Sequence, residues 1–264
     1  MKVSEENMYS EKAQKIAIVV GVENEIGSTC ALTLQRAGHI VIMVGEKGAR
    51  TPIRADSSFE TTTDTLPLFS AQRLNPAMCD EILSTVHEYG GFAQILVNCR
   101  NQCSLTSAVD TELQNLEEAF SENVNDAFFM SQAFAKDIIF SNTGAHGTIV
   151  NLTSIFSSHA AANMSAYAAS KAALESITKS LALEWGQYNI RVNGVASIEP
   201  PFRLNRREAF ETEKLASRIP YQHQLVQVNE VVNAILYLCS DASRGITGQI
   251  LTVDNGFTVN GNWK

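Results

Sequence analysis

Seven short apolar runs punctuate the chain, and each has the length and composition of a buried strand. They cover residues 15–21, 39–45, 65–71, 93–99, 147–153, 189–196 and 249–253. Between most of these runs the apolar residues recur at helical spacing. Strands that alternate with helices favour a parallel sheet with helices on both faces. The pattern therefore predicts an α/β fold: one doubly wound, Rossmann-type domain with a seven-stranded parallel sheet.

Three segments interrupt this alternation. Residues 1–14 are polar and acidic, and we expect a flexible extension there, ahead of a single domain over residues 15–264. Residues 47–65 are rich in Ser and Thr and have little apolar periodicity, which predicts a loop or one short helical turn. Residues 197–224 combine a proline pair with a charged helical stretch after the sixth predicted strand.

Charge and cysteine usage narrow the range of functions. The 28 acidic and 20 basic residues give a net charge of −8, which disfavours nucleic acid or an anionic membrane as a partner. No apolar stretch approaches the length of a bilayer span, and the polar N-terminal segment differs from a secretory signal, so we expect a cytoplasmic protein. The five cysteines lack the paired spacing of a zinc site, which favours reduced thiols and no metal: Cys30, Cys79, Cys99, Cys103 and Cys239.

Candidate chemistry lies in the second half of the chain. Tyr167 and Lys171 are four residues apart on a predicted helix, so they share one face, and the ammonium favours the phenolate. Ser154 ends an apolar run, at the edge of the sheet where open α/β folds bind ligands. Taken singly, a tyrosine on an amphipathic helix is usually a packing residue, and a serine after a strand is usually a turn former.

With Asn123 in the preceding helical segment and a C-terminal run over residues 246–256, the sequence resembles the short-chain dehydrogenase/reductase family from Lys15 to about Phe257. The resemblance implies that Asn123, Ser154, Tyr167 and Lys171 are the catalytic residues. Tyr167 would be the general acid or base and Ser154 would polarise the substrate oxygen. Lys171 would assist Tyr167 and bind the nicotinamide ribose, and Asn123 would hold a helix bend and a proton-relaying water. By the same resemblance, residues 197–224 would form the substrate lid.

The resemblance also implies a dinucleotide site, NAD or NADP, and the chain departs from its usual pattern at several positions. Gly21 and Gly27 supply two of the glycines expected after the first strand, but Glu25 occupies the middle position, beside Ile26. A side chain there crowds the phosphates, and its carboxylate repels them. Glu46, after the second strand, favours NAD, whereas Lys47 and Arg50 leave NADP open.

Two further cofactor positions differ from the family pattern. After the fourth strand the usual Asn-Asn-Ala-Gly is replaced by Asn98, Cys99, Arg100 and Asn101, of which only Asn98 matches. Arg100 would bring cationic charge that offsets Glu25. Ser197 stands where the family has the first residue of a Pro-Gly pair. Tyr167 and Lys171 complete the expected cofactor contacts.

The sequence therefore favours an NAD(P)-dependent oxidoreductase that interconverts a ketone and a secondary alcohol, with a small-molecule substrate. A 3-oxoacyl reductase, a steroid dehydrogenase and a sugar alcohol dehydrogenase fit equally well. Two alternatives remain: a pteridine reductase-like enzyme, and a noncatalytic binding or regulatory protein with weakened cofactor affinity. The family commonly assembles through its central helices, so a homodimer or homotetramer is expected.

Overall fold

Parallel strands form the centre of the molecule, as the apolar runs predict. The computed structural model describes residues 14–46, 68–141, 144–198 and 216–260. The predicted extension over 1–13, the predicted loop over 47–65 and residues 199–215 of the predicted lid lie outside these ranges. The sheet has the order β3-β2-β1-β4-β5-β6-β7, and all its pairs are parallel. Its strands are β1 (Ile16–Val20), β2 (Ile40–Gly45), β3 (Leu68–Ser70), β4 (Ala93–Asn98), β5 (Gly147–Ser154), β6 (Ile190–Ser197) and β7 (Ile250–Val253).

Helices connect these strands, and local capping explains where two of them begin. The helices are α1 (Glu25–Arg36), α2 (Pro76–Glu88), α3 (Leu113–Phe120), α4 (Asp126–Phe140), α5 (Ser165–Trp185) and α7 (Val228–Cys239). Asn24 caps α1, because its side-chain oxygen accepts a hydrogen bond from the Gly27 amide. Asn75 caps α2 in the same way, with Pro76 in the first turn, where the missing N–H costs nothing.

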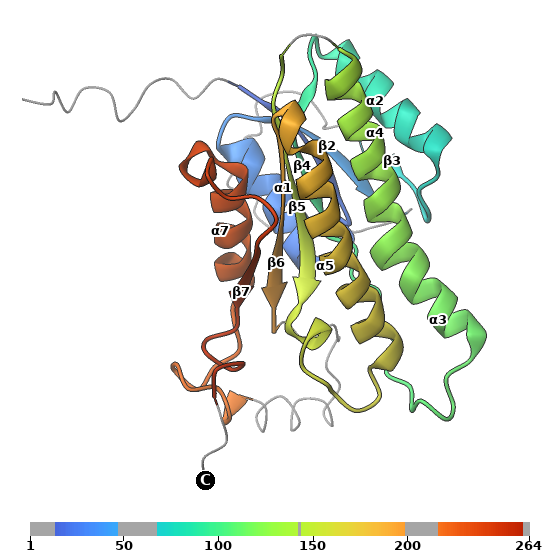
Figure 1. Ribbon diagram of the computed structural model, residues 1–264, viewed down its shortest axis with the longest axis vertical. Helices are drawn as coiled ribbons and strands as arrows, with labels where there is room; N and C mark the ends of the chain where they lie inside the picture. The colour runs from blue at the N-terminus through green and yellow to red at the C-terminus, as the bar shows by residue number, and fades with distance from the viewer. Residues whose placement is uncertain (1–13, 47–67, 142–143, 199–215, 261–264) are drawn as a thin grey trace, which may run out of the picture.

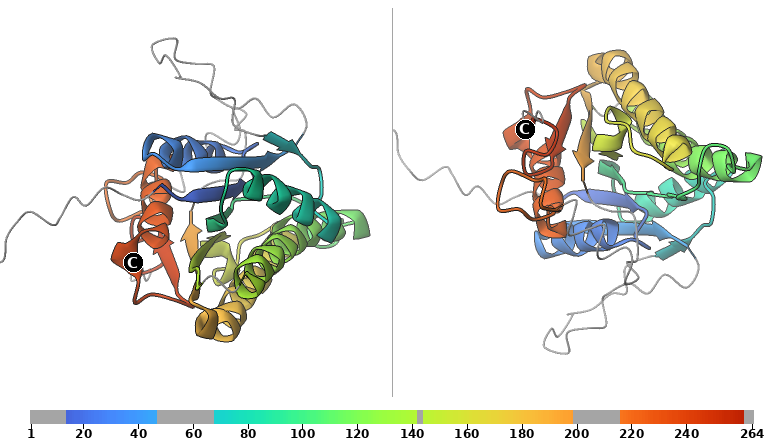
Figure 2. Two further views of the ribbon diagram at one scale, coloured as in Figure 1. Left: turned by 90° about the horizontal axis from the view of Figure 1, so that it is seen from above. Right: turned by 90° about the horizontal axis from the view of Figure 1, so that it is seen from below.

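The sheet lies between two helical layers. Alternate residues of β1 enter different cores, because successive side chains of a strand point to opposite faces. Ala17 and Val19 pack with α1 and α7, whereas Ile18 packs with α2, α4 and α5. Figure 1 shows α1 and α7 beside one face of the sheet and α2, α4 and α5 beside the other. The end-on views of Figure 2 show α7 next to α1.

The helix predicted around Asn123 differs from a regular α-helix. Residues Ser121–Asn125 form one π-helical turn between α3 and α4. Asn123 is buried in this turn, and its side chain bonds to the backbone of Gln102. A π turn places one extra residue in the helix, which changes the direction of the side chains that follow it. The apolar periodicity of the segment predicts the helix but gives no signal for the turn.

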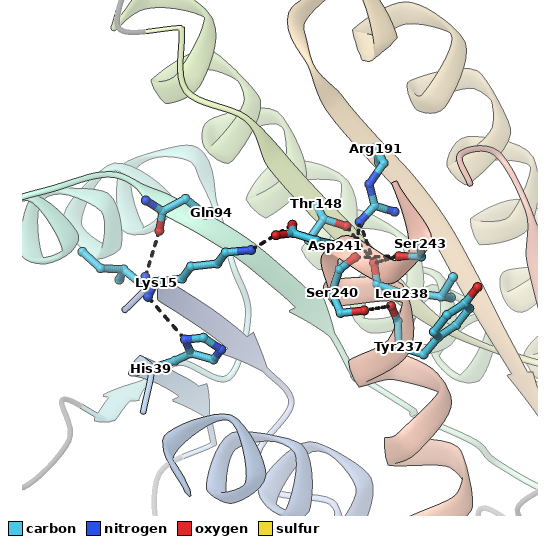
Figure 3. Close-up of polar contacts among 11 residues, drawn as sticks. Lys15, His39, Gln94, Thr148, Arg191, Tyr237, Leu238, Ser240, Asp241 and Ser243 are labelled. Atoms are coloured by element: carbon cyan, nitrogen blue, oxygen red, sulfur yellow. Dashed lines mark hydrogen bonds and ion pairs between the residues drawn. The ribbon is translucent and has the colours of Figure 1, made fainter. Parts of the chain in front are cut away.

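Polar contacts close the edge of the sheet at which the strands begin (Figure 3). Lys15 bonds through its backbone amide to His39 Nδ1, at 3.3 Å, and through its ammonium to Asp241, at 3.4 Å. Arg191 of β6 donates to the carbonyl of Leu238, at 2.8 Å, near the C-terminus of α7. A guanidinium is favourable there because the last carbonyls of a helix lack intrahelical partners. A cavity of 460 Å³ opens at this edge, away from the predicted catalytic residues.

Candidate active site

The turn after β1 requires glycine at two positions. Gly21 has φ of +92°, and a Cβ there would lie 2.6 Å from the backbone nitrogen of Arg100. A Cβ on Gly27 would collide with the Gly21 carbonyl oxygen. Through Gly21 the turn therefore packs against the backbone that follows β4. Asn24 strengthens this contact by donating a hydrogen bond to the Cys99 carbonyl at 2.6 Å. The two predicted glycines thus form a tight turn at the edge where the strands end.

Glu25 and its neighbours define the first turn of α1. Glu25 is exposed, whereas Ile26 is buried against the sheet. The half-buried carboxylate of the turn is that of Glu23, which lies 3.4 Å from the guanidinium of Arg100. The cation that sequence analysis set against Glu25 is therefore paired with Glu23. Position 25 is the first residue of the helix, where an acidic side chain interacts favourably with the helix dipole.

The segment after β4 contacts three of the four predicted catalytic residues. The carbonyl of Arg100 accepts a hydrogen bond from the Lys171 ammonium at 2.9 Å. The next residue, Asn101, accepts one through its amide oxygen from the Tyr167 hydroxyl, also at 2.9 Å. The backbone of Gln102 exchanges two hydrogen bonds of 2.8 Å with the side chain of Asn123. Three consecutive residues thus bring the predicted catalytic residues of α5 and of the π-helical turn to the end of β4.

Tyr167 and Lys171 are both buried on one face of α5. Tyr167 is 2% exposed and Lys171 is 0% exposed. The Lys171 ammonium lies 5.8 Å from the centre of the Tyr167 ring and also donates to the carbonyl of Leu152, at 3.0 Å. A buried ammonium requires such acceptors, because it has lost its water. The bond to Leu152 anchors the lysine to β5, two residues before Ser154.

Two serines stand side by side where β5 and β6 end. Ser154 and Ser197 are paired in the register of these strands, and both are buried. The Ser154 hydroxyl oxygen accepts from the backbone amide of Phe156 at 3.3 Å, which leaves its proton available for a further hydrogen bond. Asn98, the last residue of β4, turns its side chain inward and donates to Ser131 and Asn151. Its amide group therefore joins β4 to α4 and β5.

Arg100 is the centre of an ion cluster that sequence analysis did not identify. Its side chain is 2% exposed, donates to the Ala71 carbonyl and lies 3.5 Å from Asp126. Glu46, at the end of β2, is 3.8 Å from the same guanidinium. Burial raises the pKa of Asp126 to about 6, although the amide of Leu74 and the positive charge of Arg100 both oppose the rise. The cluster joins the ends of β1, β2 and β4 to the first turn of α4.

Burial dominates the pKa of the neighbouring carboxylates as well. It raises the pKa of Glu23, and the positive charge of Arg100 partly offsets the effect. The pKa of Glu122 is raised for the same reason, again against the attraction of Arg100. The Arg73 guanidinium lies 3.8 Å from Glu122 and also opposes the rise, so two cations, Arg73 and Arg100, face these carboxylates. The sequence signals for this cluster are two charged residues in unusual places. Arg100 closely follows a buried strand, and Asp126 begins a helix that is otherwise largely apolar.

The thiols near the site are not activated. Cys99 is buried, and burial raises the pKa of the Cys103 thiol to about 12 although Lys171 opposes the rise. Only a thiolate is a strong nucleophile or metal ligand, so this environment does not favour redox chemistry at Cys103. None of the five cysteines forms a disulfide, in agreement with their spacing. Among the described residues no group of three or more His, Cys, Asp or Glu side chains is arranged to hold a metal ion.

Comparison with known proteins identifies the family to which the chain belongs. Residues 21–258 match a protein family described as enoyl-(acyl carrier protein) reductase. The chain belongs to the short-chain dehydrogenase/reductase family. It is 32% identical to gluconate 5-dehydrogenase of Gluconobacter oxydans over 92% of this chain and 94% of that protein. It is 33% identical to L-xylulose reductase of Mesocricetus auratus over 94% and 98%, respectively.

Solved structures of the family share the fold. A gluconate 5-dehydrogenase from Burkholderia cenocepacia, in complex with NADP and tartrate, has a TM-score of 0.78 and 27% identity and covers 93% of this chain and 95% of its own. Membership of the family makes this protein an NAD(P)-dependent oxidoreductase of the type that interconverts alcohols and carbonyl compounds. Among its described residues, no helix has the length and apolar character needed to cross a membrane.

Proposed function

We propose that this enzyme interconverts a ketone and a secondary alcohol, with Tyr167 as the group that gives or takes the proton. The hydrogen bonds between residues 100–102 and the side chains of Lys171, Tyr167 and Asn123 are the main support, because they hold three buried polar side chains together at the end of β4. A buried lysine and tyrosine on one helical face otherwise cost free energy that ordinary packing residues would not. Their burial therefore favours a catalytic role.

Each side chain then has a defined task. Tyr167 donates its hydroxyl proton to a carbonyl oxygen in reduction and takes a proton from an alcohol in oxidation. Ser154 donates a hydrogen bond to the same substrate oxygen and stabilises the charge that develops on it. Lys171 supplies the positive charge that favours loss of the Tyr167 proton. Asn123 acts through the backbone of Gln102 and so keeps the loop after β4 in register with α5.

The residues at this edge fit a nicotinamide dinucleotide, which supplies or accepts the hydride when bound. Gly21 and Gly27 permit the tight turn that leads into α1, and Ile26 lies in the first turn of this helix, where the helix dipole favours an anion such as a diphosphate. Lys171 and Tyr167 would bind the nicotinamide ribose, while Ser197 and Asn98 border the site from the ends of β6 and β4.

Two carboxylates favour NAD over NADP. Glu46 follows β2 and is about half exposed, and Glu23 lies on the same side of Arg100. Carboxylates bond the two hydroxyls of an adenosine ribose, but they repel a 2′-phosphate. The single guanidinium of Arg100 is already shared with Asp126. Titration with NADH and NADPH, followed by nicotinamide fluorescence, tests this preference, and equal or tighter binding of NADPH would contradict it.

The relatives favour a small polyhydroxylated substrate. Their names describe a gluconate dehydrogenase, xylulose reductases and a D-erythrulose reductase, at identities of 29–33% over more than nine-tenths of this chain. We therefore place a sugar-type ketone or its alcohol ahead of a 3-oxoacyl thioester or a steroid. A screen of ketoses, sugar acids and an acetoacetyl thioester separates these classes, and turnover of the thioester alone would reverse the order.

Substitution of Tyr167 tests the chemistry. The variant Tyr167→Phe retains the ring but lacks the hydroxyl, so turnover should fall by about 100-fold or more while the melting temperature changes little. Tyr89→Phe is the matched control, because Tyr89 is an exposed residue at the end of α2. Turnover that survives in Tyr167→Phe would refute the assignment.

The alternatives have weaker support. A pteridine reductase-like enzyme would have an aspartate in place of Ser154. A noncatalytic protein would not need the buried lysine and tyrosine.

We also propose that the enzyme is a homodimer or homotetramer, because Leu113 and Leu116 of α3 and Leu183 of α5 expose apolar side chains. Light scattering tests this, and a monomeric mass would exclude it. The cytoplasmic location stays a prediction.

A further inference from the structure

The side chain of Asn101 lies at the reacting atom of the proposed chemistry. Its amide oxygen accepts the hydrogen bond of the Tyr167 hydroxyl at 2.9 Å. Asn101 is partly exposed, whereas the tyrosine is buried. Glycine is the residue expected here from the family pattern, and glycine has no side chain to offer. The contact is therefore a property of this chain.

This hydrogen bond distinguishes the two protonation states of the tyrosine. A phenol has one proton to donate, and a phenolate has none. Because Asn101 is bonded through its oxygen, the contact stabilises the protonated tyrosine. A phenolate could keep a contact with Asn101 only if the amide turned over and presented its NH2 group. The hydrogen bond also occupies the proton that a substrate carbonyl would accept, so a substrate must displace the amide before proton transfer begins.

Other charged groups around Tyr167 act in known directions. Lys171, on the same helix, lies 5.8 Å from the ring centre and favours the phenolate. Cys103, in the segment after β4, interacts electrostatically with Lys171 and carries no charge near neutral pH. The Arg100 guanidinium is turned toward Glu23 and Asp126, so only its backbone reaches α5. Among the described residues, Asn101 therefore opposes Lys171.

We propose that Asn101 is a positioning residue that holds Tyr167 protonated until a substrate oxygen replaces the amide. The resting enzyme is then prepared to donate a proton, which is the requirement for carbonyl reduction. The inference rests on the proposed function of Tyr167. In this proposal the Asn101 side chain influences both the pH range in which the enzyme works and the affinity for the carbonyl substrate.

Two substitutions at this position have effects of opposite sign. Asn101→Ala removes the acceptor, so the pH at which alcohol oxidation reaches half its maximal rate should fall by a few tenths to about one unit. The KM for the carbonyl substrate should fall by about twofold to tenfold, because no amide must be displaced. Asn101→Asp replaces the acceptor by a carboxylate that attracts the proton and repels the phenolate, so the same half-maximal pH should rise by about one unit or more.

Direct titration of the tyrosine provides a readout that needs neither cofactor nor substrate. In protein labelled with carbon-13 at the tyrosine Cζ, the resonance of Tyr167, assigned with Tyr167→Phe, should titrate at lower pH in Asn101→Ala and at higher pH in Asn101→Asp. Asn163→Asp is the matched control, because Asn163 is exposed, precedes α5 and has only its backbone in a hydrogen bond. It should leave the titration unchanged.

Three results would overturn the inference. The first is a Tyr167 resonance that titrates alike in the wild type and Asn101→Ala. The second is a shift in Asn163→Asp as large as that in Asn101→Asp. The third is a rise in the carbonyl KM of Asn101→Ala. If Asn101→Asp fails to fold by circular dichroism, the sign of the shift in Asn101→Ala decides alone. Turnover that persists in Tyr167→Phe would refute the proposed function, whereas the resonance titration would still test the contact with Asn101.

Discussion

Asp126 should make the stability of this enzyme fall as the pH rises from about 4 to about 7. Its carboxylate is 1% exposed at the start of α4, and burial raises its pKa from the ordinary value of 3.8 to about 6. The folded state therefore holds this proton more tightly than the unfolded state. The contribution is complete below the unfolded pKa of 3.8 and is lost as the pH rises through about 6.

The size of the effect follows from the two pKa values. The difference between 3.8 and about 6 corresponds to about 3 kcal/mol of free energy of unfolding. Asp126→Asn cannot ionise, and its amide oxygen can still accept the hydrogen bond of 2.9 Å from the Leu74 amide. The wild type should therefore lose up to about 3 kcal/mol relative to Asp126→Asn between pH 4 and pH 7.

Urea unfolding at a series of pH values measures this difference. Asp80→Asn, at an exposed position of α2, is the reference for a change of charge without burial. The reasoning would be refuted if the curves of stability against pH for the wild type and Asp126→Asn ran parallel. It would also be refuted if Asp126→Asn lost stability relative to the wild type as the pH rose, because Arg100 would then control the titration.

Three further predictions concern the cofactor turn and a nearby thiol. Glu25→Gln removes a carboxylate from the first turn of α1 and should tighten dinucleotide binding about twofold to fivefold at low salt, by calorimetry; an unchanged affinity would mean that this exposed carboxylate does not approach the diphosphate. Gly27→Ala should cost about 2 kcal/mol or more by thermal unfolding, because its Cβ meets the Gly21 carbonyl, whereas Gly38→Ala, with open space and positive φ, should cost about 1 kcal/mol. Cys103 should react with iodoacetamide at neutral pH far more slowly than a free cysteine, by mass spectrometry, because its thiol has a pKa of about 12.

The apolar pattern predicts most of the fold because a parallel sheet is buried on both faces. All eight residues of β5 are buried, so the strand reads as one uninterrupted run in the sequence. The seven strands of the sheet follow from such runs. The third predicted run is the exception, since β3 is confined to Leu68–Ser70 in the described part of the chain, and its outer residues are exposed. An edge strand of three residues carries little periodicity.

Local spacing predicts candidate catalytic residues but not the contacts that hold them. Tyr167 and Lys171 are recognisable because one helical turn separates them. The partners that hold them come from the loop after β4: Asn101 and the carbonyl of Arg100 are about 70 residues away along the chain. No pattern in one segment specifies a contact of this range, because it depends on which strands are neighbours in the sheet. The order of the strands was the missing information.

The carboxylate that pairs with Arg100 near the glycine turn is likewise one that sequence spacing did not identify. The family spacing draws attention to Glu25, which interrupts the glycines, but the helix begins at that residue and leaves its side chain exposed. Glu23 lies two residues earlier, before the Asn24 cap, and there the backbone turns its carboxylate toward Arg100. Two residues therefore separate the half-buried carboxylate of Glu23, before the helix, from the exposed carboxylate of Glu25, at its first residue.

The loop after β4 belongs both to the ion cluster around the Arg100 side chain and to the hydrogen bonds that hold Tyr167 and Lys171. The sequence pattern gives no link between these two sets of contacts. A guanidinium beneath the surface requires counter-charge, which Asp126 provides from a helix whose neighbouring residues are apolar. The backbone carbonyl of Arg100 accepts a hydrogen bond from Lys171, and the side-chain amide oxygen of Asn101 accepts one from Tyr167. Charges at the ends of β1 and β2 and at the start of α4 thus fix the backbone that holds Tyr167, the proposed proton-transfer group. Changes in that ion cluster should consequently alter the pH dependence of the enzyme, although no member of the cluster lies at the reacting atoms.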